Sequence, residues 1–184
     1  NLADIDNFNY NYSENTRRLV FKNNEKRFGK IVIDTSLFNS SLCEIGKNYN
    51  TNKSPYNLNG HRSGYTGLYY LLFSQLQKKN LVVAEIGIEK NASIRLLRDF
   101  FNNSEIHGFE FEEEKIKKAL NDNLPNAFYH KIDVGNPDSI KKVFEQTNKK
   151  FDIIIDDSTH LFDHQINIIY NVNKYLKENG ILII

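Results

Sequence analysis

From residue 81 onward, short apolar runs alternate with longer segments whose apolar residues recur at helical spacing. The apolar runs cover residues 81–88, 105–109, 127–132, 151–155 and 181–184, and the helical segments cover 92–101, 112–121, 137–147 and 161–177. Strands separated by helices of this length are typical of βαβ crossovers, which connect parallel strands. The first and fourth runs, LVVAEIGI and FDIII, are almost continuously apolar, as expected for strands buried on both faces. The sequence therefore predicts an α/β fold with a doubly wound, mostly parallel sheet.

The chain ends on the last of these apolar runs. Gly180 is expected to end the long helix over 161–177, and residues 181–184 to form the fifth strand. An edge strand of this composition, with no neighbour on its outer side, would be prone to aggregation. We therefore expect the sheet to be truncated after its fifth strand here, with the natural protein continuing beyond Ile184.

The first 80 residues differ from the rest of the chain in composition and periodicity. Residues 1–44 are polar and show little periodicity, apart from one apolar run over 30–34 that predicts a short strand. Residues 65–79 place aromatic and leucine side chains at helical spacing and end in two lysines, which favours a helix. We predict a polar N-terminal extension over 1–44, a cap and helix over 45–80, and a Rossmann-like core over 81–184. The sequence leaves open whether the extension is a tail, a cap or a dimer arm.

Charge and composition argue against several classes of partner. The 24 Lys and Arg nearly balance the 23 Asp and Glu, so no global field would attract nucleic acid or anionic lipid. No apolar run approaches the roughly 18 residues of a membrane helix, and the first residues are too polar for a secretory signal. The single cysteine, Cys43, excludes an internal disulfide and a cysteine-based zinc site. We expect a cytoplasmic protein that binds a small molecule, and a homo-oligomer is left open.

Parallel sheets bind ligands at the carboxyl ends of their strands, so the residues that follow each strand are candidates for a site. The first strand ends in Glu85 and Gly87, and the next helix opens with Ala92 and Ser93 after Asn91. Glycine permits close backbone approach, and the free N–H groups of a helix start suit a carboxylate or phosphate. The loop lacks the GxGxxG pattern of dinucleotide sites, so by itself it is a weak signal.

The second and third strands are each followed by an acidic residue. Glu110 stands where a carboxylate can accept hydrogen bonds from ribose hydroxyls, and Asp133 stands where it could face an adenine edge. Each has a structural alternative, which is a solvated charge for Glu110 and a helix cap or turn for Asp133. The combination of such residues at three successive strand ends is more informative than any one of them.

The fourth strand is followed by DDSTH, with Asp156, Asp157 and His160. Two carboxylates suit a hard divalent cation, and a neutral imidazole can accept a proton near pH 7. The structural alternative is that Asp156 caps the next helix and His160 lies on its first turn. We favour the functional interpretation, because the end of a buried strand is a costly place for two carboxylates without a partner.

These stretches together resemble the class I S-adenosylmethionine-dependent methyltransferases, and more narrowly the metal-dependent sugar O-methyltransferases that include macrocin and mycinamicin methyltransferases. The first cofactor loop of that group is similar to residues 85–93, and its Asp-Asp-Gly-Ser-His signature is similar to residues 156–160. Its (Tyr/Phe)-Gly-Thr-Asp-Lys…His-x-Tyr segment resembles residues 49–54 together with His61 and Tyr65. The resemblance covers roughly residues 45–184.

The resemblance implies a site for S-adenosylmethionine. The methionine part of the cofactor would be bordered by Glu85, Gly87 and Ser93, with Asp156 also against the cofactor. By the same resemblance, the ribose would be held by Glu110 and the adenine contacted by Asp133.

The resemblance also implies a catalytic pair. Asp157 would bind Mg²⁺, which holds and acidifies a sugar hydroxyl, and His160 would remove its proton before the oxygen attacks the sulfonium methyl. The function expected is methyl transfer to a saccharide or glycosylated small molecule. Lys53, His61 and Tyr65 would either close over the cofactor or acceptor or belong to a packed, mostly structural cap. A non-catalytic cofactor-binding module is the alternative, and an NAD-dependent oxidoreductase is disfavoured because GxGxxG is missing.

The sequence departs from the family pattern at several positions. Asn91 replaces the second glycine of the cofactor loop, Asn50 and Asn52 replace Gly and Asp upstream, and Ser158 replaces the glycine after Asp157. The family places further acidic metal ligands after the fifth strand, beyond Ile184. Without them, weak metal binding is expected.

Overall fold

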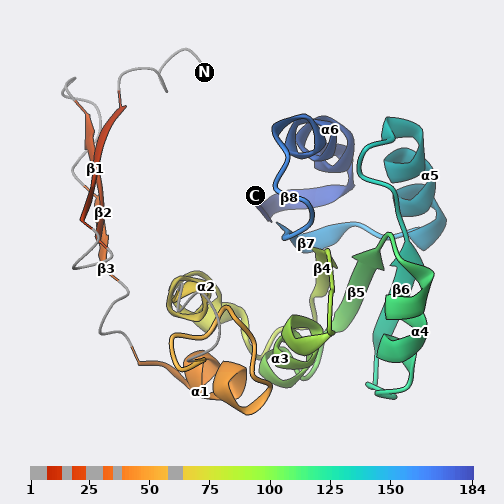
Figure 1. Cartoon of the computed structure of the whole chain (residues 1–184), viewed down its shortest axis with the longest axis horizontal. Coiled ribbons are helices and arrows are strands. Elements are labelled where there is room, and N and C mark those ends of the chain that lie inside the picture. The colour runs from red at the N-terminus through yellow and green to blue at the C-terminus, as the bar shows by residue number, and fades with distance from the viewer. Residues whose placement is uncertain (1–7, 14–17, 24–30, 35–38, 58–63) are drawn as a thin grey trace. The chain divides into compact units, whose positions relative to one another are not determined.

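The computed structural model describes residues 8–13, 18–23, 31–34, 39–57 and 64–184. The chain divides into two compact units, Asn1–Ser74 and Gln75–Ile184, and each is described by itself (Figure 1).

The first unit begins with a three-stranded antiparallel sheet. Its strands are β1 (Phe8–Ser13), β2 (Arg18–Asn23) and β3 (Ile31–Asp34), in the order β1-β2-β3. The predicted strand over 30–34 is confirmed as β3, but β1 and β2 were not predicted. In β1, aromatic residues and asparagines alternate as FNYNYS, which is a period of two that the asparagine-rich composition obscures.

Two helices complete the first unit. Helix α1 (Ser41–Asn48) begins where the Ser40 hydroxyl accepts a hydrogen bond from the Cys43 backbone N–H, at 3.2 Å. Helix α2 (Tyr65–Phe73) continues into a short 3₁₀ turn, Ser74–Leu76, so the helix predicted over 65–79 is present but shorter.

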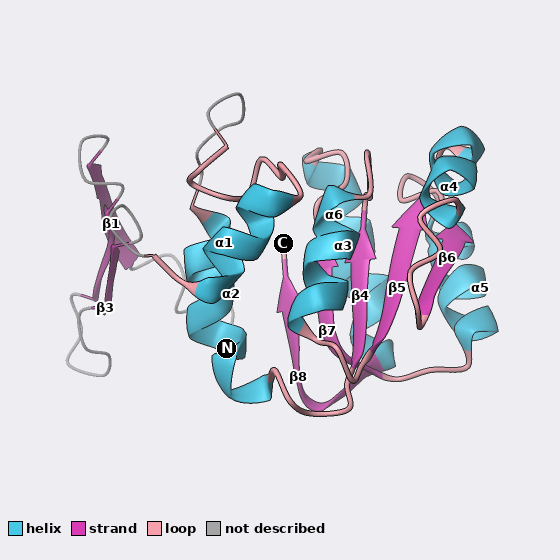
Figure 2. Ribbon diagram, turned by 90° about the horizontal axis from the view of Figure 1, so that it is seen from below, coloured by secondary structure: helices cyan, strands magenta, loops and turns pink. Residues whose placement is uncertain are grey.

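The second unit is the predicted parallel sheet. Its strands are β4 (Val82–Ile86), β5 (Glu105–Glu110), β6 (Ala127–Lys131), β7 (Phe151–Asp156) and β8 (Leu176–Ile183). They pair in the order β6-β5-β4-β7-β8, every pair is parallel, and Figure 2 shows the arrows pointing the same way. The order reverses at β4, so the loops that follow β4 and its two neighbours form the switch point where doubly wound sheets bind ligands.

Four helices cover the two faces of this sheet. They are α3 (Ala92–Phe100), α4 (Glu113–Leu120), α5 (Pro137–Thr147) and α6 (Phe162–Val172). Right-handed crossovers put α3 and α4 on one face and α5 and α6 on the other. Figure 1 shows α5 beside α6 on one side of the strands, with α3 opposite.

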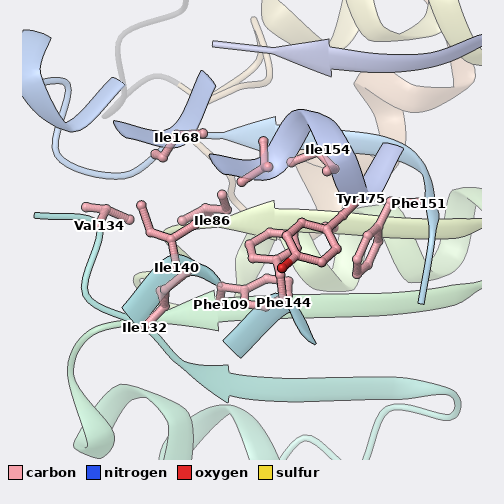
Figure 3. Packing of buried hydrophobic residues seen from close by; sticks show 12 residues of the cluster. Ile86, Phe109, Ile132, Val134, Ile140, Phe144, Phe151, Ile154, Ile168 and Tyr175 are labelled. Carbon is pink, nitrogen blue, oxygen red and sulfur yellow. The ribbon is translucent and has the colours of Figure 1, made fainter. Parts of the chain in front are cut away.

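The core between the sheet and the pair α5–α6 is rich in stacked aromatic rings. The Phe109 and Phe144 rings are 4.6 Å apart and nearly parallel, and Tyr175 stacks on Phe144 at 5.3 Å (Figure 3). Ile140 and Phe144, two of the predicted inward residues of α5, are fully buried. On the other face, the predicted residues Ile94 and Leu97 of α3 are buried as well.

The long helix predicted over 161–177 is wrong in its second half. Helix α6 ends at Val172, a 3₁₀ turn covers Asn173–Tyr175, and β8 has already begun at Leu176. Gly180 therefore lies within the strand and does not end the helix. The pairing shifts between Phe151↔Leu176 and Ile153↔Ile181, which leaves an irregularity around Asn179, whose φ is 62°.

Within the part of the chain that the structure describes, no helix combines the length and the apolar character needed to cross a membrane.

Two histidines form a stacked pair inside the sheet unit. Their rings are 5.2 Å apart with 7° between the planes, and His107 Nδ1 lies 2.9 Å from His130 Nε2. Phe128 stacks on His107, and Glu105 Oε2 lies 3.5 Å from His107 Nε2. Burial lowers the pKa of both rings, to about 4 for His130, where the neighbouring His107 lowers it further. The pair is therefore neutral in the native protein at pH 7.

This pair should make the protein sensitive to acid. In the unfolded chain the histidine binds a proton below about pH 6.5, whereas His130 in the native protein stays neutral down to about pH 4. Its contribution to the free energy of unfolding is therefore fully present above pH 7 and is lost as the pH falls toward 4. We expect the free energy of unfolding to be about 2 kcal/mol lower at pH 5 than at pH 7.5, measured by urea denaturation. His130→Gln should flatten this dependence, whereas His164→Gln on α6 should not. An unchanged slope in His130→Gln would contradict the assignment.

Candidate functional site

The strand register places the predicted site residues at one edge of the sheet. Ile86 pairs with Phe109 on one side and with Asp156 on the other, and Glu110 pairs with Lys131. The residues that follow these strands therefore leave the sheet at the same level, on neighbouring strands. The structure brings the loops of Gly87, Glu110, Asp133 and Asp157 to this carboxyl edge.

Gly87 lies where two of these loops touch backbone to backbone. Its φ is 89°, its N–H donates to the Phe109 carbonyl at 2.7 Å, and the Asp157 N–H donates to the Ile86 carbonyl at 2.8 Å. A Cβ at position 87 would lie 2.3 Å from the Asp157 carbonyl oxygen and 2.8 Å from Ser158 Cα. Only glycine meets both the positive φ and the close approach.

Glu85 connects β4 to the start of α3. It is fully buried, and its Oε2 accepts a short hydrogen bond from the Ser93 hydroxyl. Two of the predicted cofactor residues, Glu85 and Ser93, are thus in direct contact, which fixes the first turn of α3 against the strand. The free N–H groups of that turn open on the carboxyl edge.

Glu110 holds two loops through backbone N–H groups. Its Oε2 accepts from Ile88 and Glu89, at 3.2 and 3.3 Å, and its Oε1 accepts from Phe111 and Glu112, at 2.9 and 3.1 Å. Glu110 is 7% exposed, so it is not the solvated charge of the structural alternative. The next side chain, Phe111, is 60% exposed and presents an aromatic ring to solvent.

Asp156 carries a buried oxygen that the protein leaves unsatisfied. Oδ1 accepts from the Ser158 N–H at 3.1 Å, whereas Oδ2 is buried and has no hydrogen-bond partner among the described residues. Burial raises the pKa of Asp156, and the hydrogen bond from the Ser158 N–H offsets only part of that rise. An unsatisfied buried carboxylate oxygen is costly, and a cationic donor would relieve the cost.

Asp157 and His160 face each other across the loop after β7. Asp157 Oδ1 lies 3.7 Å from His160 Nε2, and the His160 side chain is 66% exposed. His160 has a φ of 58° and precedes α6, which begins at Phe162 with Leu161 as its cap. Asp156 therefore does not cap α6 and His160 is not on its first turn, contrary to the structural alternative.

Asp133 forms a turn at the end of β6. Its Oδ1 accepts from the Gly135 N–H at 2.9 Å, which is the turn geometry of the structural alternative. The same turn borders α6, because a Cβ at Gly135 would lie 3.0 Å from His164 Nε2 and 3.2 Å from Asp133 Oδ1. His164 Nδ1 lies 2.8 Å from Thr159 Oγ1, so His164 links the Asp133 turn to the loop after β7.

Two residues that lie beside the predicted ones were not predicted as candidates, Phe111 and His164. Phe111 could have been predicted from its place directly after Glu110, because it is a hydrophobic residue at the end of a strand that closes with a carboxylate. His164 is four residues past His160, but its contact with the Asp133 turn depends on tertiary packing.

The upstream residues with a predicted closing role lie in the first unit. Lys53 is buried and Tyr65 is half exposed, whereas His61 lies outside the described residues.

Few side chains among the described residues could serve as metal ligands. No group of three or more His, Cys, Asp or Glu side chains among them could hold an ion. Asp157 supplies one accessible carboxylate beside the His160 imidazole. Mg²⁺ is commonly held by one or two carboxylates with waters and substrate oxygens, so Asp157 fits a weak, substrate-completed site.

Comparison with known proteins shows what this arrangement is similar to. A sequence model for a methyltransferase domain matches residues 77–184. The MycE methyltransferase from the mycinamycin biosynthetic pathway, solved with Mg and SAH (S-adenosylhomocysteine), is 19% identical with a TM-score of 0.65, over 79% of this chain and 36% of that one. No curated protein matches the chain.

Two further structures share the fold. MycE in complex with Mg, SAH and mycinamycin VI is 16% identical with a TM-score of 0.65, over 87% of this chain and 51% of that one. Coclaurine N-methyltransferase bound to N-methylheliamine and SAH is 11% identical with a TM-score of 0.50, over 68% of this chain and 37% of that one. The chain thus spans between 36% and 51% of the length of these structures.

Proposed function

Because the chain belongs to the methyltransferase domain family over residues 77–184, we propose that it is an S-adenosylmethionine-dependent O-methyltransferase acting on a saccharide or glycosylated small molecule. The observation that carries the proposal is Asp156, whose Oδ2 is buried at the strand edge without a hydrogen-bond partner among the described residues. The donor carries an ammonium and a sulfonium, and a cation of this kind satisfies a buried carboxylate oxygen. The fold shared with MycE, which was solved with SAH and mycinamycin VI, supports the acceptor class.

The carboxyl edge offers a partner for each part of the donor. The methionine part would lie along Glu85, Gly87 and Ser93, with its carboxylate at the N–H groups of α3 and its ammonium at Asp156. The ribose would lie at Glu110, whose carboxylate holds the loop after β4 through the Ile88 and Glu89 N–H groups.

The adenine would lie further along the same edge. The exposed Phe111 ring offers it an apolar face, and the Asp133 turn offers polar groups to its edge.

Methyl transfer from a sulfonium needs alignment and a deprotonated acceptor. The methyl is already activated, so the enzyme mainly holds the acceptor oxygen in line with the carbon–sulfur bond. His160 would take the hydroxyl proton on Nδ1, and Asp157, whose Oδ1 lies 3.7 Å from Nε2, would stabilise the imidazolium that forms. When bound, a magnesium ion on Asp157 would lower the pKa of the acceptor hydroxyl.

Ligand binding tests the proposal. SAH should raise the melting temperature by about 5 °C or more at a concentration 100-fold above its Kd, whereas NADH at the same concentration should not. No shift with SAH, or an equal shift with NADH, would refute the proposal.

Substitution of Asp156 tests the observation on which the proposal rests. Asp156→Asn removes the charge that the donor's ammonium would meet, so the Kd for SAH should rise about 10-fold or more, measured by calorimetry. Asp152→Asn is the matched control, because Asp152 lies at the other end of β7, where it accepts from the Val82 N–H and Lys177. Equal effects of the two substitutions would argue against an ammonium site at Asp156.

A further inference from the structure

A hydrogen-bonded cluster outside the carboxyl edge holds the end of the first loop. The Asn91 amide donates to Asp122 Oδ2 at 2.7 Å and to the Tyr129 hydroxyl at 2.8 Å, and that hydroxyl donates back to Asn91 Oδ1 at 3.1 Å. Arg95 fixes Asp122 with two hydrogen bonds of 2.7 Å. Asn91 is 2% exposed, so its side chain is buried among these partners.

Asn91 adopts a backbone conformation that favours glycine. Its φ is 64°, its N–H donates to the Ile88 carbonyl at 2.7 Å, and its carbonyl accepts from the Arg95 N–H at 3.1 Å. It therefore closes the turn after Gly87 and begins α3 with the same residue. A left-handed conformation is unfavourable for a residue with a side chain, and asparagine tolerates it best when its amide is hydrogen-bonded. Here the amide bonds lead to Asp122, in the turn after α4, and to Tyr129 on β6 rather than to the local backbone.

We propose that Tyr129 and Asp122, acting through Asn91, are positioning residues that hold the first loop in its donor-binding conformation. The loop they hold runs from Gly87 to the start of α3, where Glu110 accepts from Ile88 and Glu89. The inference rests on the proposed function, because the loop is taken to line the donor site. The side chains themselves bond the outer end of the loop and contact neither Asp156 nor Glu110 through any of their described hydrogen bonds.

The competing interpretation is that the cluster only ties α3, the turn after α4 and β6 together. A glycine at residue 91 adopts a φ of 64° without side-chain support, so the Tyr129 hydroxyl would have nothing left to position. A purely structural tie would also be lost there, because the described hydrogen bonds of this hydroxyl are to Asn91. The two interpretations therefore differ in what Tyr129→Phe changes in the wild-type background: a structural tie lowers the melting temperature and leaves the Kd for SAH unchanged, whereas a positioning role raises the Kd.

A double-mutant cycle decides between them. Tyr129→Phe should raise the Kd for SAH about 5- to 10-fold in the wild-type background and less than about twofold in the Asn91→Gly background. Melting temperatures of the four proteins are measured alongside, so that a loss of affinity is separated from a loss of fold. Equal changes in Kd in the two backgrounds, or an unchanged Kd after Tyr129→Phe, would overturn the inference.

A measurement without ligand keeps this inference separate from the proposed function. Hydrogen exchange at the backbone amides of Ile88, Glu89 and Asn91 should be faster in Tyr129→Phe than in the wild type, and equal in the two Asn91→Gly proteins. If the wild type binds no SAH, the proposed function fails, and exchange alone tests whether Tyr129 holds the loop. Unchanged exchange at these amides in Tyr129→Phe would overturn the role of Tyr129.

Discussion

Gly87→Ala should eliminate SAH binding and lower the free energy of unfolding by about 3–5 kcal/mol. The new Cβ would stand 2.3 Å from the Asp157 carbonyl oxygen, and both contacting groups are backbone. One of the two loops must therefore move, and these are the loops that carry Asn91 and His160. The φ of 89° adds a strain that alanine cannot relieve. Urea denaturation and calorimetric titration with SAH measure the two effects.

Gly108→Ala is the matched control. A Cβ there would lie 3.0 Å from atoms of the Ile88 and Tyr129 side chains, which can shift by a few tenths of an ångström. We expect a loss of stability of about 1–2 kcal/mol and a Kd for SAH within a few-fold of the wild type. If Gly87→Ala were as mild as Gly108→Ala, the close approach of the two loops would not be a requirement of the fold.

His160→Ala should lower the rate of methyl transfer about 100-fold or more while leaving the Kd for SAH unchanged. The imidazole is 66% exposed and lies 3.7 Å from Asp157, and none of the groups proposed to bind the donor is His160. Loss of the base affects only the removal of the proton from the acceptor hydroxyl. Transfer of a labelled methyl group to a saccharide acceptor measures the rate, and calorimetry measures donor affinity.

Two controls accompany His160→Ala. Added imidazole should restore part of the activity, because it replaces the missing proton acceptor in solution. His164→Ala removes the other histidine near this loop and should lower the rate less than about fivefold, since no proton transfer depends on it. A protein that binds SAH but transfers no methyl group, with or without His160, would be the non-catalytic module.

Much of the sheet unit could be predicted because its signals are local. Apolar runs of strand length alternate with helical periodicity, and Asn136 with Pro137 marks the start of α5 at the predicted residue. The end of α6 could not be predicted in the same way. Helical spacing continues past Val172, but Tyr175 turns inward to stack on Phe144, and β8 pairs with β7 from Leu176 onward. Tertiary packing overrides local propensity there.

The positions of the candidate site residues were predictable, and their hydrogen-bond partners less so. The parallel topology is enough to place Glu85, Glu110 and Asp156 at one edge. The partners of these residues are set by contacts between distant segments. The sequence gives no sign that Glu110 would accept four backbone N–H groups, or that Asn91 would bond Tyr129, 38 residues away.

A crystal structure of the chain with SAH tests the central claim most directly. We expect SAH at the carboxyl edge, with its ammonium on Asp156 Oδ2, its ribose on Glu110 and its sulfur turned toward the side where His160 lies. SAH bound elsewhere on the protein, or an edge that remains empty at saturating SAH with Asp156 Oδ2 still unsatisfied, would contradict it.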